Sequence, residues 1–244
     1  MSIDPAGPCA ATFRNEVCVL INWLHSVLHD PRRGWDPITE QYARDYAKNI
    51  ASLDAPLVAH FTQLTGSLAD KDVADVGSGP GQYALEFASR GARVTCFDIS
   101  RRYLQIAAER FSGAALEARF VVGYMDHIDR LGGEKFDAIF NNACWYYCMN
   151  DLAFARAMLQ ALKPGGVILV RVQTSPSPGT PWYRRVMYWL NRTLFWKVGH
   201  VLPPPGRVAH AFRRLGGCEV ETAHSNSTDV VSVRKQAQSA IASR

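Results

Sequence analysis

The chain has 244 residues, and a composition of 48% hydrophobic and 20% charged residues is typical of a folded globular protein, not of a disordered one. A formal net charge of +5 is too small to indicate nucleic-acid binding, but it is compatible with an acidic ligand or a membrane surface. Six cysteines without Cys-x-x-Cys spacing, together with the absence of a leader pattern or membrane-length apolar run, predict a cytoplasmic protein with reduced thiols and no metal site.

The first 70 residues are expected to form an N-terminal helical cap. Apolar residues recur at helical intervals over residues 11–29. A second helix is expected to begin near Asp36-Pro37, where an aspartate can cap and a proline fits the first turn, and a third over residues 53–64. Tyr42 and Tyr46 lie one helical turn apart, so both rings point from one face, where core packing would also explain them.

A glycine-rich turn follows the first predicted strand, residues 73–76. Gly77-Ser78-Gly79-Pro80-Gly81 leads from this strand into a helix predicted over residues 82–89, and Asp75 lies in the strand itself. Glycine has no Cβ, so the backbone can turn sharply and approach a ligand closely. A strand, a glycine turn and a helix form a nucleotide pocket at the carboxyl edge of a parallel sheet, although a tight turn without ligand fits the same stretch.

Two further strand ends carry polar residues. The strand over residues 93–97 ends at Asp98-Ile99, where a carboxylate can accept hydrogen bonds from a ribose diol. Asp98 could instead cap the helix predicted over residues 101–111, a role that Ser100 could also fill. The next strand, residues 119–122, leads into a turn that contains Met125, Asp126 and His127.

The fourth strand, residues 136–140, leads into Asn141 and the aromatic run Trp145-Tyr146-Tyr147. Pocket residues cluster at such strand ends, and aromatic faces attract cations, but core packing explains any single ring equally well. A helix over residues 152–162 then ends at Lys163-Pro164-Gly165-Gly166, ahead of a fifth strand over residues 167–172.

The last third departs from a minimal sheet. Residues 174–207 form an insertion whose aromatic and basic segment, between Trp182 and Lys197, could contact a membrane or an amphiphile, cover the active site, or simply pack on the core. A helix over residues 208–215, strands over 218–223 and 229–234, and a polar tail over 236–244 complete the chain.

These landmarks, in this order, resemble the class I S-adenosylmethionine-dependent methyltransferases. Gly-x-Gly-x-Gly after Asp75, the acid at Asp98, Leu-Lys-Pro-Gly-Gly before strand five and a returning last strand carry the resemblance, which covers residues 71–235. The resemblance implies an α/β fold, a seven-stranded, mostly parallel doubly wound sheet with an antiparallel last strand. The helical cap at residues 1–70 and the insertion at 174–207 are additions to this core.

The resemblance also implies S-adenosylmethionine as the methyl donor. Tyr124 stands where the family commonly has an acid after its glycine, so Asp126 is expected to take over that contact with adenine. The implied cofactor-binding residues are Asp75, Gly77, Ser78, Gly79, Gly81, Asp98, Ile99, Met125, Asp126 and Asn141.

The acceptor side is expected to use the cap and the strand-four exit, with Tyr42, Tyr46, Trp145 and Tyr146 facing the substrate. His127 and His200 are the candidate catalytic bases, because imidazole titrates near neutral pH. The predicted reaction is methyl transfer to a small organic acceptor, with a hydroxyl oxygen favoured.

An N- or C-methyltransferase, a membrane-lipid methyltransferase and a methyltransferase-like binding module without turnover remain alternatives. Absence of Asn-Pro-Pro-Tyr after strand four argues against a nucleic-acid substrate. Either a monomer or a homodimer is compatible with the sequence.

Overall fold

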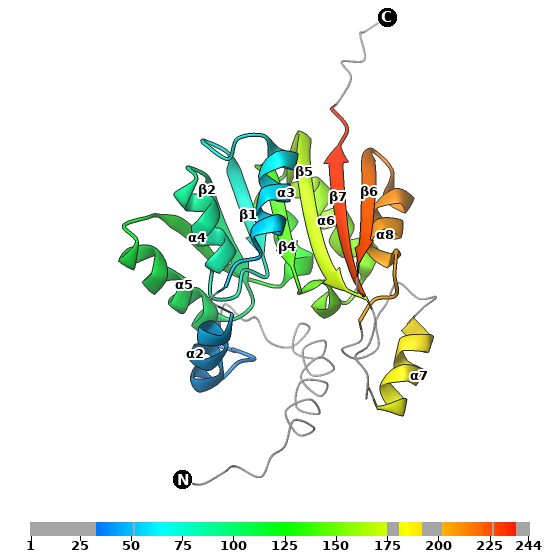
Figure 1. The fold of residues 1–244 in the computed structure, drawn as a ribbon, viewed down its shortest axis with the longest axis horizontal. Coiled ribbons are helices and arrows are strands. Elements are labelled where there is room, and N and C mark those ends of the chain that lie inside the picture. Colours follow the sequence, from blue (N-terminus) through cyan, green and yellow to red (C-terminus); the bar gives the residue numbers. More distant parts are fainter. Residues whose placement is uncertain (1–32, 51, 175–180, 192–201, 226, 238–244) are drawn as a thin grey trace, which may run out of the picture.

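The computed structural model describes residues 33–50, 52–174, 181–191, 202–225 and 227–237. Within these ranges a seven-stranded sheet forms the centre of the molecule, with helices on both faces (Figure 1). The strands are β1 Asp72–Val76, β2 Arg93–Asp98, β3 Ala118–Val122, β4 Phe136–Asn142, β5 Leu162–Gln173, β6 Cys218–Ser225 and β7 Thr228–Lys235.

The strand order is β3-β2-β1-β4-β5-β7-β6. All neighbouring pairs from β3 to β5 are parallel, whereas β7 is antiparallel to both β5 and β6. The predicted fold class, a mostly parallel doubly wound sheet with an antiparallel last strand, is therefore confirmed. The Leu-Lys-Pro-Gly-Gly stretch, expected as a turn, instead forms the beginning of β5, with a register irregularity against β4 between Phe136 and Ala138.

The described helices agree with the predicted ones to within a few residues, except at the N-terminus and in the insertion. Residues 11–29 lie outside the described part of the chain, and the insertion helix is described only over Trp182–Asn191. The α-helices are α2 Glu40–Asn49, α3 Ala55–Thr65, α4 Gln82–Ser89, α5 Arg101–Gly113, α6 Asp151–Ala161, α7 Trp182–Asn191 and α8 Arg207–Leu215, and the 3-10 helices are η2 Met125–Leu131 and η3 Trp145–Tyr147.

The first helix of the described cap, α2, begins differently from the prediction. Thr39 is its N-cap, and the Thr39 side chain accepts a hydrogen bond from the backbone N–H of Tyr42 at 3.3 Å. The expectation that Asp36 caps this helix is wrong, because the Asp36 carboxylate accepts from the Ile38 N–H ahead of the helix and from Ser100 and Arg102, and from no N–H of α2.

The core consists of two apolar layers, one on each face of the sheet. Successive strand residues point to opposite faces, so Val73 and Ala74 of β1 belong to different layers. Helices α3, α4 and α5 cover one face, where Phe61 of α3 is fully buried. Helices α6 and α8 cover the other face, where Phe154 of α6 is fully buried. Both faces being covered explains why the strands are nearly continuous apolar runs.

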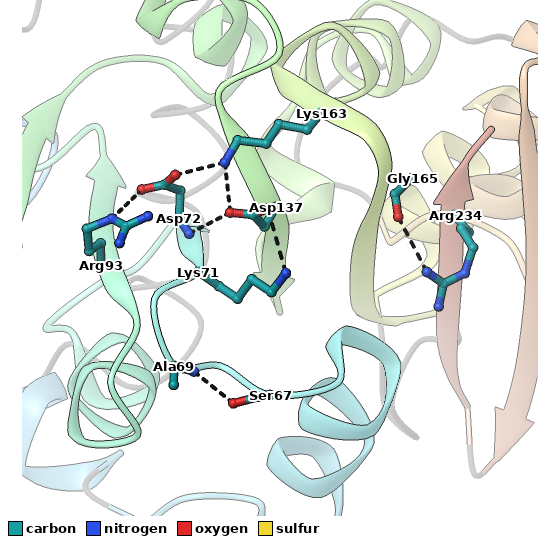
Figure 2. A network of polar contacts seen from close by, with 9 residues as sticks. All are labelled: Ser67, Ala69, Lys71, Asp72, Arg93, Asp137, Lys163, Gly165 and Arg234. Carbon is teal, nitrogen blue, oxygen red and sulfur yellow. Dashed lines mark hydrogen bonds and ion pairs between the residues drawn. The ribbon is translucent and has the colours of Figure 1, made fainter. Parts of the chain in front are cut away.

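Charged residues connect the amino ends of four strands (Figure 2). The Lys163 ammonium lies 2.9 Å from carboxylate oxygens of both Asp72 and Asp137, and Arg93 donates from Nε to Asp72 at 2.9 Å. The hydrogen bond from Arg93, followed by those from Lys163, lowers the pKa of Asp72 to about 2. This network stabilises the edge of the sheet opposite the glycine turn.

Both α2 and α7 lie beyond the other edge of the sheet, where the parallel strands end (Figure 1). Helix α2 packs on α5 through a small apolar cluster that contains Ala43 and Ile106. Helix α7 is connected to the end of β5 by a hydrogen bond from the Tyr188 hydroxyl to the Thr174 carbonyl, at 3.0 Å. In the described part of the chain, no helix combines the length and apolar character needed to span a membrane.

Candidate functional site

The glycine turn between β1 and α4 places three glycines in the left-handed region. The φ angles of Gly77, Gly79 and Gly81 are 72°, 52° and 77°. A Cβ on Gly77 would lie 2.2 Å from Cys144 Sγ, whereas a Cβ on Gly79 would meet no described atom within 4 Å. The turn is thus packed against the residues after β4 at Gly77, and it is open to a ligand at Gly79.

Asp98 connects this turn to the end of β2. Its Oδ2 accepts a hydrogen bond from Gly79 N at 2.9 Å, and its Oδ1 accepts one from Ser100 N at 2.8 Å. Ser100 itself caps α5 by accepting from Tyr103 N at 3.2 Å. The capping role therefore falls to Ser100, and the carboxylate of Asp98 faces the glycine turn instead.

Two carboxyl groups on the paired strands β1 and β2 are buried at this edge: Asp75 is 2% exposed and Asp98 is 8% exposed. Burial raises the pKa of Asp75 to about 8, and the charge of Asp98 adds to the effect. Burial also raises the pKa of Asp98 to about 6, against the opposing effect of its backbone hydrogen bonds. A positive charge placed nearby would favour the ionised form of both groups.

The end of β4 contributes a polar atom with no partner. Asn141 is fully buried, and its Nδ2 donates to the Val76 carbonyl at 2.8 Å and to Cys144 Sγ at 2.7 Å. Its Oδ1 has no hydrogen-bond partner among the described residues. Buried polar atoms are normally paired, so this oxygen marks a place for a ligand or a water molecule beside the glycine turn.

A group of tyrosines, Tyr42 and Tyr46 of α2, Tyr103 of α5, and Tyr146 and Tyr147 of η3, gathers at the same edge; we call it the tyrosine cluster. The rings of Tyr42 and Tyr46 stack with centroids 6.1 Å apart, Tyr46 and Tyr103 are 5.5 Å apart, and Tyr146 and Tyr147 are 4.8 Å apart. Burial raises the pKa of Tyr146, and the phenols of Tyr147, Tyr46 and Tyr42 add to this effect. Residues of α2 and η3 therefore lie within electrostatic range of one another.

Burial, followed by the charges of Tyr42 and Asp98, also raises the pKa of Tyr46. A phenol whose pKa is raised keeps its proton at neutral pH. Tyr46 and Tyr146 are thus suited to donate hydrogen bonds and to present aromatic faces, and they are poorly suited to act as bases.

Of the four predicted acceptor residues, Tyr42, Tyr46 and Tyr146 are brought together, and Trp145 is not. Trp145 is fully buried, packs on Phe154 at 4.6 Å, and donates from Nε1 to Asp151 at 2.7 Å. The structure places this ring in the core, which corrects the expectation that it faces the acceptor. Its neighbour Tyr147 is 43% exposed and belongs to the tyrosine cluster.

The turn after β3 forms η2. Met125 is partly buried against the core, and Asp126 Oδ2 accepts a hydrogen bond from the Met149 backbone N–H at 3.2 Å. The His127 ring lies 6.0 Å from that of Tyr124 and is partly exposed. His200, the other predicted base, lies outside the described residues. Ile99 is partly buried at the end of β2, and Ser78 is buried in the glycine turn.

Asp36, expected at the start of α2, instead connects the segment before α2 to the start of α5. Its carboxylate accepts hydrogen bonds from Ser100 Oγ at 2.9 Å and from the backbone N–H of Arg102 at 3.0 Å. Asp36 therefore binds the first turn of α5 and holds the segment before α2 against the end of β2. An Asp-Pro pair suggests a local cap, and no sequence signal identified this distant partner.

Three comparisons place this geometry among known proteins. Residues 73–166 match a family described as a methyltransferase domain. A demethylmenaquinone methyltransferase of Tropheryma whipplei (strain Twist) is 35% identical over 111 residues, which is 44% of either chain. A ubiquinone biosynthesis O-methyltransferase of Alkalilimnicola ehrlichii is 28% identical over 141 residues, 56% of this chain and 53% of the relative. The chain thus spans about half the length of these relatives.

Among solved structures, an O-methyltransferase family protein from Burkholderia thailandensis superimposes with a TM-score of 0.62 at 15% identity. The superposition covers 96% of this chain and 74% of that one. At this identity the likeness shows the fold alone.

Proposed function

We propose that this chain, which carries a class I S-adenosylmethionine-dependent methyltransferase domain, transfers a methyl group from S-adenosylmethionine to a small organic acceptor, with a hydroxyl oxygen favoured. The observation that carries the proposal is the buried junction of Asp98 with the glycine turn, inside the segment that matches the family. The relative from A. ehrlichii is named an O-methyltransferase, which supports oxygen as the accepting atom.

The residues at the junction fit the donor molecule. A ligand can approach the backbone closely at Gly79, and Asn141 Oδ1 is buried without a partner among the described residues. The buried carboxyl groups of Asp75 and Asp98 could bind a cationic group and a diol. We assign Asp98 to the ribose and Asp75 to the charged methionine end. When bound, S-adenosylmethionine would supply a methyl group already activated on a sulfonium.

The chain's own residues would then position the acceptor and shield the reacting groups from water. The tyrosine cluster would hold an acceptor close to the donor, and alignment of two reactants accounts for much of the rate gain in such displacements. A hydroxyl acceptor must also lose a proton during the transfer. Of the two candidate bases, His127 is the one within the described residues, and we assign this role to it. Met125 and Ile99 are assigned to the adenine surroundings, together with Asp126.

Transfer to nitrogen or carbon, and transfer to a membrane lipid, are the alternative reactions. A binding module without turnover is the non-enzymatic alternative. Because these alternatives share the donor site, only the product distinguishes them.

The test is incubation of the purified chain with an extract of its source cell and S-adenosylmethionine labelled in the methyl group. We expect one labelled small molecule, and mass spectrometry will identify the methylated atom. Asp98→Ala should weaken donor binding by about 1.5–3 kcal/mol, the range for hydrogen bonds to a charged group. Glu117→Gln, at an exposed carboxyl before β3, is the matched control and should bind normally. No donor binding by the unaltered chain at millimolar concentration would refute the proposal.

A further inference from the structure

Helix α7 exposes an apolar face. Trp182 is 77% exposed and Trp189 is 68% exposed, and between and beside them Val186 and Leu190 are 46% and 42% exposed. At 3.6 residues per turn, these four side chains fall within about 100° of the helix circumference. A continuous apolar face of this kind on a helix normally packs against something.

The opposite side of α7 faces the rest of the molecule. Tyr188 is partly buried and donates its hydroxyl hydrogen to the Thr174 carbonyl at the end of β5, at 3.0 Å. An ordinary cover helix buries its apolar face and exposes its polar one. In α7 the tryptophans point outward while Tyr188 connects the helix to the sheet, so core packing does not account for the apolar face.

The charge of α7 distinguishes between two possible partners of its apolar face, a second copy of the helix and an anionic surface. The segment Trp182-Tyr183-Arg184-Arg185-Val186-Met187-Tyr188-Trp189-Leu190-Asn191 contains two arginines and no acidic residue. Arg185 is exposed. A second copy of the same helix would place like charges close together, whereas a surface of anionic headgroups would complement them.

The position of the helix fits the same interpretation. Helix α7 lies beyond the edge of the sheet where the parallel strands end, as does α2, which carries part of the tyrosine cluster (Figure 1). Helix α7 therefore lies at the same end of the molecule as the candidate site (Figure 1).

We propose that α7 binds the surface of an anionic lipid bilayer, lying in the plane of the interface with Trp182 and Trp189 at the level of the headgroups. Tryptophan prefers this region because its ring is apolar and its N–H can bond to water or headgroups. Amphipathic helices with basic residues bind such surfaces through buried apolar area and attraction to anionic lipid. This inference does not depend on methyl transfer.

The test uses the full chain and vesicles of phosphatidylcholine with or without phosphatidylglycerol. We expect co-sedimentation with the anionic vesicles, weakening as salt is added, and a blue shift of tryptophan fluorescence. The double variant Trp182→Ala/Trp189→Ala should bind at least about tenfold more weakly, because two large apolar side chains are lost from the interface. Arg185→Glu should also weaken binding, whereas Arg119→Glu, at an exposed arginine of β3, should not.

Circular dichroism and urea unfolding verify that each variant is folded. An unaltered chain that stays in the supernatant with anionic vesicles would overturn the inference, and so would a tryptophan double variant that binds normally. Self-association in sedimentation velocity that is lost in the double variant would assign the face to a second copy instead. Because vesicle binding is measured without donor or acceptor, a negative result leaves the proposed methyl transfer untouched.

Discussion

Replacing Gly77 by alanine tests how tightly the glycine turn is built against the end of β4. The new Cβ would lie 2.2 Å from Cys144 Sγ and 2.9 Å from Cys144 Cβ, both closer than real Cβ atoms approach. The thiol cannot rotate away freely, because it is hydrogen-bonded to Asn141 Nδ2 at 2.7 Å and to the Val76 carbonyl at 3.2 Å. The backbone at φ 72° adds a second cost, since alanine is disfavoured in the left-handed region.

We expect Gly77→Ala to lower the unfolding free energy by about 2–4 kcal/mol, of which about 1 kcal/mol is backbone strain and the rest is overpacking. Urea unfolding measures the loss. Gly79→Ala is the matched control, because Gly79 also has a positive φ but a Cβ added there would have no neighbouring atom within 4 Å. That variant should lose only about 1 kcal/mol, the backbone part.

Cys144→Ala, alone and combined with Gly77→Ala, tests whether the contact with Cys144 causes the loss of stability. It removes the sulfur at 2.2 Å and leaves only the contact at 2.9 Å, so the double variant should be more stable than the sum of the two single changes predicts. The coupling free energy should be at least about 1 kcal/mol. Equal losses for Gly77→Ala and Gly79→Ala, or additive losses in the double variant, would refute the reasoning.

Four further predictions concern buried charges. Burial raises the pKa values of Asp98 and Asp75 to about 6 and about 8. A cationic donor should therefore bind more tightly as pH rises toward 8, and its binding should release protons. Calorimetry in buffers of different ionisation enthalpy measures this release. A binding enthalpy independent of buffer would contradict the assignment of these carboxyl groups to the donor site. Without donor, the unfolding free energy should fall as pH rises from about 4, the ordinary aspartate pKa, to about 8, because the folded state keeps these protons to a higher pH than the unfolded state does. Asp36→Ala should cost about 1–3 kcal/mol in urea unfolding, because the Ser100 hydroxyl and the Arg102 N–H at the start of α5 lose their acceptor, and Asp36→Asn should cost less. Asp151→Ala should cost about 3–5 kcal/mol, because it removes the buried carboxylate that accepts a hydrogen bond from Nε of the buried Arg207 at 2.8 Å; an unchanged urea midpoint would disprove this.

Local features of the chain determined much of the fold. Alternating apolar runs, the glycine turn and the polar residues at strand ends predict a parallel sheet with its functional edge after β1 and β2, because strand and turn conformations depend on neighbouring residues. The contact between Asp98 and the glycine turn lies at the edge where the sequence predicts it, since parallel strands that are adjacent end together.

Residues whose partners are distant in sequence could be placed only by the tertiary structure. Asp36 looks like a local helix cap, yet it bonds to Ser100 and to Arg102, which are 64 and 66 residues away. Within the run Trp145-Tyr146-Tyr147, the pattern cannot tell which ring is buried, because that depends on how α6 and α8 pack behind η3. The outward tryptophans of α7 are a similar case. A helical pattern defines an apolar face, and only the arrangement of the whole chain decides whether that face meets the core or the surroundings.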